Sequence, residues 1–242
     1  NKNVINKLNG EGIYEVNDEG LQKVSSEDTI VIRSHGVAPQ LMKKIKDTGA
    51  HVIDATCPYV TAIHKNIKKY YDLGYQIVIV GDEKHPEVIG SNGWCNNTAI
   101  ITRDGSEINI TADKVCIVAQ TTEKISNLEK VKEAVSKQCK EVVTFNTICS
   151  ATKERQKSAE ETSKIVDVML VVGSSTSSNT TKLYEICKKN CENTFFIDNS
   201  NEIPSWIMES NEVKKVGVTA GASTPDWIIQ EVLDKLYSNL EK

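Results

Sequence analysis

Short apolar runs alternate along the chain with longer stretches whose apolar residues recur at helical spacing. Most of the runs are four or five residues long and continuous, which is typical of strands in a parallel sheet with both faces covered. We predict strands at residues 29–33, 51–54, 76–80, 115–118, 141–145, 168–172, 194–197 and 215–218.

Helices with recognisable ends fill the intervals between these strands. Pro39 begins one helix and Gly49 closes it, and the last helix starts at Pro225. One helix carries an apolar stripe made of Val60, Ile63, Ile67 and Tyr70. Alternating strands and helices predict an α/β fold with right-handed crossovers.

Two of the predicted strand ends resemble each other. Asp54 and Asn146 each stand three positions before a cysteine, Cys57 and Cys149. This similarity suggests repetition of a module of roughly 90 residues. We therefore predict small parallel-sheet α/β modules in a pseudo-threefold arrangement around a central cavity, at residues 1–57, 58–147 and 148–242. The repeat also predicts a further cysteine of this kind upstream of residue 1.

Composition and charge exclude several classes of protein. Apolar residues make up 39% and charged residues 26%, as in ordinary globular proteins. The 29 basic and 33 acidic residues give a net charge of −4, which argues against a nucleic-acid or anionic-membrane partner. No apolar run approaches the roughly 20 residues of a membrane span. The chain opens at Asn1 without a methionine or a visible signal peptide, so we expect residues before it.

The seven cysteines favour a reducing environment. Their number is odd, their spacing is wide and no CxxC pair occurs, so a secreted disulfide framework is not expected. We expect a cytoplasmic protein. Cys57 and Cys149 differ from the other five, because each follows a strand in a threonine-rich loop where a thiolate could bind a metal. With histidines nearby, they are compatible with zinc or with part of an iron–sulfur cluster.

Two polar turns have the features of phosphate-binding loops. The serine-rich segment 173–181 lies between a predicted strand and a helix, and the segment 219–223 repeats this design with a glycine. Unpaired N–H groups and the helix dipole favour an anion at such positions. Either loop alone fits a capped turn equally well, but two of them favour phosphate binding. Because neither contains Arg or Lys, neutral donors and histidines would hold the anion.

Two histidines follow strand ends in loops. His35 lies in one of them, and His85 in the other is followed by Pro86 and Glu87. The proline fixes the turn, and a carboxyl group near an imidazole can donate a proton in a dry pocket. These residues alone allow an acid/base site and no more. A zinc-dependent hydrolase or lyase acting on a phosphorylated small molecule, or a non-catalytic phosphate-ligand binding module, remain alternatives.

Seven segments, in the same order, resemble the 4-hydroxy-3-methylbut-2-enyl diphosphate reductase family of isoprenoid biosynthesis. Each match is weak alone, but collinear matches over essentially the whole chain are specific. The segments are Ser34-His35-Gly36-Val37, Asp54-Ala55-Thr56-Cys57-Pro58, His85-Pro86-Glu87, Gln120-Thr121-Thr122, Ile148-Cys149-Ser150-Ala151-Thr152, Gly173-Ser174 with Ser177-Ser178-Asn179, and residues 217–223.

The resemblance implies reductive dehydroxylation of an allylic diphosphate at a [4Fe–4S] cluster held by three cysteines. The products are isopentenyl and dimethylallyl diphosphate, and the electron donor is a ferredoxin or a flavodoxin. Cys57 and Cys149 match two of the three cysteines, and the third would fall before Asn1.

The resemblance also implies roles for individual residues. Glu87 and Thr121 match catalytic groups near the substrate hydroxyl, with Glu87 as the proton donor and Thr121 also in contact with the substrate. The remaining matches are diphosphate-binding residues: His35, His85, Ser177, Ser178, Asn179 and Ser223. We expect five of them to converge on one anion: His35, His85, Ser177, Asn179 and Ser223.

Overall fold

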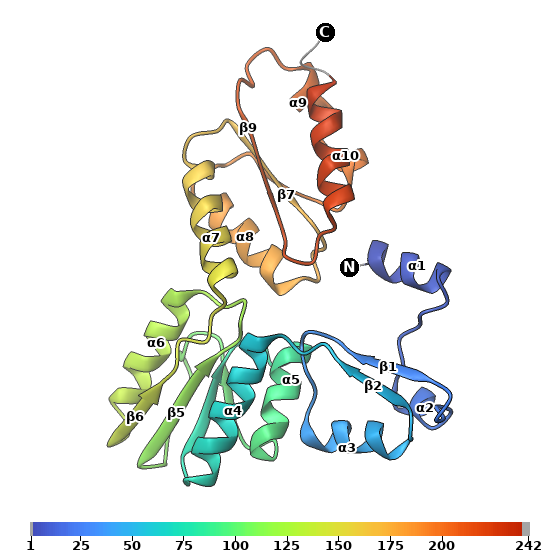
Figure 1. Ribbon diagram of the computed structural model, residues 1–242. Helices are drawn as coiled ribbons and strands as arrows, with labels where there is room; N and C mark the ends of the chain where they lie inside the picture. The colour runs from blue at the N-terminus through green and yellow to red at the C-terminus, as the bar shows by residue number, and fades with distance from the viewer. Residues whose placement is uncertain (1, 239–242) are drawn as a thin grey trace. The chain divides into compact units, whose positions relative to one another are not determined.

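The structure, a computed structural model, describes residues 2–238 of the 242-residue chain. The chain divides into two compact units (Figure 1). Unit 1 comprises Asn1–Tyr14 and Ser150–Lys242, and unit 2 comprises Glu15–Cys149. Every strand pair in the described residues is parallel, as the continuous apolar runs predict.

Unit 2 contains a small sheet of two strands. β1 (Thr29–Ile32) pairs with β2 (His51–Asp54), and α3 (Pro39–Asp47) connects them; a short helix, α2 (Asp18–Leu21), precedes β1. One face of this sheet is open, because Val31 is 58% and Ile53 46% exposed. On the strands' inner side Ile32 is buried, as is Ile45 of α3.

The second sheet of unit 2 has four strands in the order β4-β3-β5-β6. The strands are β3 (Gln76–Val80), β4 (Ile100–Thr102), β5 (Lys114–Ala119) and β6 (Glu141–Thr144), and the helices are α4 (Pro58–Asp72), α5 (Pro86–Asn92), the 3₁₀ turn η1 (Gly93–Cys95) and α6 (Ile125–Ser136). Alternate residues of β3 face opposite layers: Val78 packs in the cluster that contains α6, and Ile79 in the cluster that contains α4 and α5.

Unit 1 has a three-stranded sheet in the order β8-β7-β9. The strands are β7 (Val168–Val172), β8 (Thr194–Ile197) and β9 (Val216–Ala220), and the helices are α1 (Lys2–Gly10), α7 (Ser150–Ser163), α8 (Ser178–Lys188), the 3₁₀ turn η2 (Ser200–Glu202), α9 (Ser205–Glu209) and α10 (Asp226–Tyr237). Central β7 is fully buried. Leu170 packs with residues of α9 and α10, and Met169 and Val171 pack with residues of α7 and α8.

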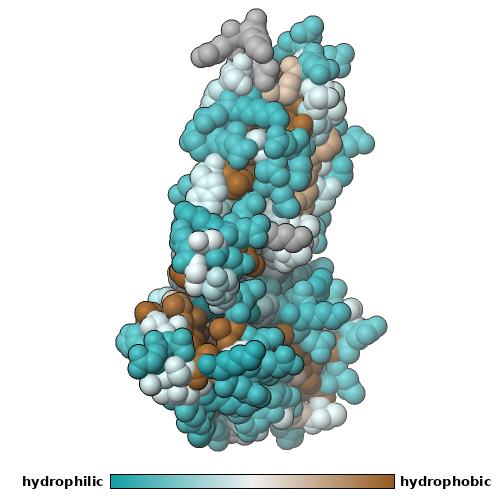
Figure 2. Space-filling view, turned by 90° about the vertical axis from the view of Figure 1, so that its right-hand side faces the viewer, coloured by the Kyte–Doolittle hydropathy of each residue, from teal (hydrophilic) through white to brown (hydrophobic). Residues whose placement is uncertain are grey.

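The predicted α/β class, built from small parallel sheets, is confirmed. All eight predicted strands form, but the sequence analysis missed β4, and β9 begins one residue later than predicted and ends two residues later, at Ala220. The division into modules at residues 57 and 147 stays a prediction. No helix among residues 2–238 is long and apolar enough to span a bilayer. Hydrophilic side chains dominate the face shown in Figure 2, where apolar residues form separate patches.

A threonine side chain ties β5 to the segment after β6. Thr147 Oγ1 accepts the Ala119 N–H at 2.9 Å and donates to the Ala119 carbonyl at 2.5 Å. Replacing Thr147 by valine leaves both buried backbone groups unpaired, so we expect the free energy of unfolding to fall by about 1–3 kcal/mol. Urea-induced unfolding measures this loss.

Thr144 provides the matched control for that experiment. Its Oγ1 is buried without a hydrogen-bond partner. Thr144→Val removes an unsatisfied hydroxyl at nearly constant volume, and we expect no loss of stability. Equal losses for the two variants would contradict the role assigned to Thr147.

Candidate functional site

The strand-to-helix junctions of unit 2 place reactive side chains at helix N-termini. Helices α4 and α5 both begin with a proline, whose fixed φ suits the first helical position. The residue before each proline is the N-cap: Cys57 for α4 and His85 for α5. The first N–H groups of a helix have no partner within it, so these positions are suited to anionic ligands.

His85 is oriented by the helix that it caps. Its Nδ1 accepts the N–H of Glu87 at 3.2 Å. A neutral imidazole with Nδ1 as acceptor carries its proton on Nε2, which makes Nε2 the donor toward a ligand. The ring of His35 meets the ring of His85 edge-on, with centroids 5.3 Å apart. The structure therefore brings together the two histidines predicted to bind diphosphate.

His35 lies half-buried at the end of β1. Its Nδ1 is buried and has no hydrogen-bond partner. Burial lowers the pKa of His35, and the positive charge of Arg33 lowers it further. The ring is thus biased toward its neutral form, and an arriving anion would favour the protonated form.

Glu87 and Thr121 form a buried polar pair. The Glu87 side chain accepts the Thr121 N–H at 2.7 Å and the Thr121 hydroxyl at 2.6 Å. Glu87 is 3% and Thr121 7% exposed. Both carboxyl oxygens are thereby held in fixed positions between the start of α5 and the end of β5. The two residues predicted to act near the substrate hydroxyl are in direct contact.

Backbone hydrogen bonds connect the two special cysteines to these groups. The Cys149 N–H donates to the Thr121 carbonyl at 3.0 Å, and the Cys57 N–H donates to the Ser34 carbonyl, next to His35, at 3.0 Å. Both thiols are free and half-buried. By contrast, Cys95 and Cys116 are fully buried, and burial raises the pKa of both thiols, that of Cys116 to about 12.

The donor set fits part of an iron–sulfur site. Cys57 and Cys149 are thiols at strand ends that solvent or a cofactor can reach, which is the chemistry that iron–sulfur clusters require. Residues 2–238 do not gather three His, Cys, Asp or Glu side chains into one metal-binding group. The described residues therefore account for two ligands and leave the remainder of a cluster's ligand set unassigned.

Unit 1 carries the two polar loops, packed tightly against each other. A Cβ on Gly221 would lie 2.0 Å from Thr180 Oγ1, and one on Gly173, whose φ is +137°, would lie 2.5 Å from Thr224 Oγ1. Only glycine permits this approach. Ser177 is the N-cap of α8, and the Ser223 hydroxyl donates to its Oγ at 3.4 Å. Ser178 lies half-buried in the first turn of the same helix.

Among the predicted site residues of unit 1, Asn179 is the one whose buried polar atoms most clearly need a ligand. It is 4% exposed, and neither its Nδ2 nor its Oδ1 has a hydrogen-bond partner. A buried amide with both polar atoms unsatisfied is costly, at about 1–3 kcal/mol for each group. A bound ligand that accepts from and donates to this amide would remove that cost.

Two residues near the site were missed by the sequence analysis. Arg155 of α7 donates from Nη1 to the Ala220 carbonyl at 3.1 Å, so a guanidinium borders the loop that contains no cation of its own. His64 of α4 packs beneath the turn after His35, where a Cβ on Gly36 would lie 2.6 Å from its Cε1. Arg155 lies three residues after Thr152, the end of the matched segment that contains Cys149, and the sequence alone reveals neither its contact with Ala220 nor the His64 contact.

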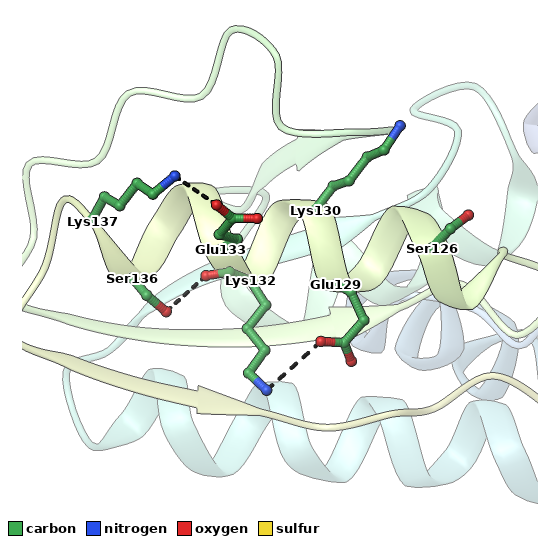
Figure 3. A pocket seen from close by; sticks show the side chains of 7 residues that line it. All are labelled: Ser126, Glu129, Lys130, Lys132, Glu133, Ser136 and Lys137. Atoms are coloured by element: carbon green, nitrogen blue, oxygen red, sulfur yellow. Dashed lines mark hydrogen bonds and ion pairs between the residues drawn. The ribbon is translucent and has the colours of Figure 1, made fainter.

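A surface hollow on α6 carries no further site. Its lining consists of Ser126, Glu129, Lys130, Lys132, Glu133, Ser136 and Lys137 (Figure 3). The charges pair along the helix, with Lys137 Nζ 2.7 Å from Glu133 and Lys132 Nζ 3.8 Å from Glu129. Exposed pairs of this kind are ordinary features of a solvated helix face.

The predicted site residues thus form one group within each unit. Unit 2 holds His35, Cys57, His85, Glu87, Thr121 and Cys149, and unit 1 holds Ser177, Ser178, Asn179 and Ser223. Within unit 2 the histidines contact each other, as do Glu87 and Thr121. Convergence of the five predicted anion-binding residues on a single anion stays a prediction.

Fold and site together define an α/β protein with closely packed polar loops and half-buried thiols after the ends of its parallel strands. The family model described as "LytB protein" matches residues 1–237. The chain belongs to this family.

Named relatives agree with the family match. A Clostridium tetani protein named 4-hydroxy-3-methylbut-2-enyl diphosphate reductase is 53% identical over 236 residues, which cover 98% of this chain and 37% of the relative. A Clostridium perfringens protein of the same name is 50% identical, with 98% of this chain and 84% of the relative covered. The chain thus spans well under half of the first relative and most of the second.

Two solved structures share the fold. The structure of E-1-hydroxy-2-methyl-but-2-enyl-4-diphosphate reductase from Plasmodium falciparum matches with a TM-score of 0.85 at 27% identity, covering 95% of this chain and 73% of that one. A structure titled as (E)-4-hydroxy-3-methyl-but-2-enyl diphosphate reductase, the terminal enzyme of the non-mevalonate pathway, matches with a TM-score of 0.69 at 37% identity. Its match covers 98% of this chain and 85% of that chain.

The buried His64 should make the stability of the protein sensitive to acid. Burial lowers the pKa of His64 from 6.5 to about 4, against a smaller opposing effect of Asp54. Below pH 6.5 the unfolded chain binds a proton that the folded protein does not bind. We therefore expect the free energy of unfolding to fall by up to about 3 kcal/mol from this residue as the pH drops from 6.5 toward 4.

Urea unfolding at a series of pH values checks this expectation. His64→Phe keeps an aromatic ring but cannot titrate, so its stability should fall less steeply between pH 6.5 and 4. Substitution of the exposed His51 by glutamine should leave the steep dependence in place. Parallel curves for wild type and His64→Phe would contradict the assignment.

Proposed function

We propose that this protein carries out the reductive dehydroxylation of 4-hydroxy-3-methylbut-2-enyl diphosphate to isopentenyl and dimethylallyl diphosphate. The substrate takes up two electrons and two protons, its allylic C–O bond breaks, and the hydroxyl leaves as water. The match over residues 1–237 and the names of the relatives support this reaction over a zinc hydrolase or a non-catalytic phosphate-binding module.

The observation that carries the proposal is the buried pair of Glu87 and Thr121. Loss of a hydroxyl group requires a proton on the departing oxygen. Glu87 is the proton donor in this proposal. When Oε2 is protonated, it donates to the Thr121 hydroxyl in place of accepting from it, while the Thr121 N–H still holds Oε1. Thr121 contacts the substrate hydroxyl and can pass a proton between that hydroxyl and Glu87.

The diphosphate is bound by neutral donors and histidines. His85 donates from Nε2, because the Glu87 N–H occupies its Nδ1. An anion bound beside His35 would counteract the lowering of its pKa and so favour the protonated ring. Ser177, Ser178, Asn179 and Ser223 supply hydroxyl and amide donors to the same chemical group, and Asn179 thereby gains partners for its buried side-chain amide.

A [4Fe–4S] cluster would be held in part by Cys57 and Cys149. When bound, it would supply the electrons for the reduction, drawn from a carrier such as a ferredoxin or a flavodoxin. The chain's own part is to hold two thiolates at strand ends, next to the backbone of Ser34 and Thr121. The seven free cysteines suit a reducing compartment, and we propose a cytoplasmic location.

Substitution of Glu87 by glutamine tests the proton donor. Glutamine keeps the shape and most hydrogen bonding of Glu87 but has no ionisable proton. We expect substrate binding to stay near normal and turnover to fall on the order of 10²–10⁴-fold. The assay uses anaerobically reconstituted protein with a reduced viologen as the electron donor.

The exposed Glu83, in the same loop, supplies the control. Glu83→Gln should retain full turnover. If Glu87→Gln also kept turnover within a few-fold of wild type, Glu87 would be a structural residue and the proton would come from elsewhere.

Iron content tests the cysteine assignment separately. Cys57→Ser and Cys149→Ser should each lower bound iron and acid-labile sulfide several-fold after anaerobic reconstitution, because serine is a poor ligand for this iron. Cys139→Ser changes a cysteine that lies three residues after the end of α6, and it should keep the wild-type content. Undiminished iron in both single variants would refute the ligand assignment.

A further inference from the structure

The turn that carries His35 is packed closely against side chains of neighbouring residues. Gly36 has φ +65°, and its N–H donates to the Arg33 carbonyl at 3.0 Å. A Cβ at Gly36 would approach His64 Cε1 to 2.6 Å and Thr56 Cγ2 to 3.0 Å. The backbone that follows His35 therefore rests directly on the imidazole ring of His64.

Trp94 of η1 contacts both His64 and the turn. Its ring stacks on His64, with centroids 4.9 Å apart and an interplanar angle of 19°. Its Nε1 donates to the Val37 carbonyl at 3.2 Å. One side chain thus supports the His64 ring and also fixes the peptide two residues after His35.

Helix α5 approaches the same turn from the side of His85. A Cβ on Gly90 would lie 3.2 Å from the Gly36 carbonyl oxygen, and one on Gly93 would lie 2.3 Å from the Ala38 Cβ. Helix α5, which His85 caps, and the following turn η1 are therefore packed against the turn that carries His35. The distance between the two imidazoles depends on this packing.

The surroundings of His64 indicate that its ring acts through packing and not through hydrogen bonding. Its side chain is 4% exposed, and its buried Nε2 has no hydrogen-bond partner. An unsatisfied buried nitrogen costs stability that a hydrocarbon side chain would not. The proposed reaction gives His64 no role in proton transfer or ligand binding. We therefore take the packing of its flat ring between Trp94 and Gly36 to be the property that matters at this position.

We propose that His64 and Trp94 are positioning residues, whose stacked rings set the orientation of His35 relative to His85. The inference rests on the proposed function only in taking His35 as a diphosphate-binding residue. Neither ring needs to touch the substrate. They affect diphosphate binding indirectly, by holding the turn at Gly36 that follows His35.

Three variants separate the parts of this arrangement. His64→Leu removes the stacked ring, His64→Phe keeps it, and Trp94→Phe keeps a ring but deletes the hydrogen bond to Val37. Two readouts apply to each: the ¹H–¹⁵N signals of the His35 imidazole without ligand, and the Kd for inorganic diphosphate. Thermal unfolding establishes that each variant is folded. Trp227→Phe, a half-exposed tryptophan of α10, is the matched control.

We expect His64→Leu and Trp94→Phe to shift the His35 imidazole signals and to weaken diphosphate binding, by roughly tenfold for His64→Leu. His64→Phe should stay within about twofold of wild type, because it restores the stack. The exposed His51 should keep its signals in every variant. If His64→Leu does not fold, Trp94→Phe alone still tests the hydrogen bond to the turn.

Unchanged His35 signals in folded His64→Leu and Trp94→Phe would overturn the positioning role, whatever the affinity for diphosphate. Equal losses in His64→Leu and His64→Phe would overturn the role of the stacked ring. If wild-type protein does not bind diphosphate, the assignment of His35 to the anion site fails. The imidazole signals would still decide the positioning role, so the two failures are distinguishable.

Discussion

The position of the candidate site residues depends on the direction in which the parallel strands lead into the helices. Apart from β4, which is followed directly by β5, each described strand ends at the edge of its sheet before the next helix begins, so backbone N–H groups without intrahelical partners collect there. Cys57, His85 and Ser177 are the N-cap residues of α4, α5 and α8. Thiol, imidazole and hydroxyl groups therefore occupy equivalent positions, in a local field that favours negative charge. Thiolate and diphosphate are the two anions that the proposed reaction needs to hold.

Buried polar contacts then fix these groups more firmly than loops ordinarily allow. Thr121 holds both oxygens of Glu87, and its carbonyl accepts the Cys149 N–H, so one residue connects the proposed proton donor to a proposed cluster ligand. In a buried setting, each satisfied bond of this kind is expensive to break. The opposite case is Asn179, where the amide is buried and unsatisfied. The fold thus combines a preorganised polar pair with a buried, unsatisfied amide, and in the proposed function that amide gains its partners from the diphosphate.

Sequence patterns anticipated most of the fold for a simple reason: the strands of a covered parallel sheet are continuous apolar runs. The sequence patterns missed strand residues where the strand is short or its residues are polar. Ile100–Thr102 is too short to form a recognisable run, and Thr219 belongs to β9 only because it pairs with Val171 of the buried β7. The family motifs singled out His35, His85, Glu87 and Thr121, and in the structure the two histidines contact each other, as do Glu87 and Thr121. His64 has no sequence feature that marks it as more than an ordinary histidine, because its contact is with a glycine 28 positions away in the chain and forms only on folding.

The most direct test of this account is a ¹H–¹⁵N spectrum of the protein titrated with inorganic diphosphate. The account predicts saturable shifts of the Asn179 side-chain amide and of the first backbone amides of α8, together with the imidazole signals of His35 and His85. Signals of the exposed lysine-rich face of α6 should remain unchanged. Shifts confined to α6, with the Asn179 amide and both imidazoles unaffected, would contradict the claim that the strand ends form the anion-binding site.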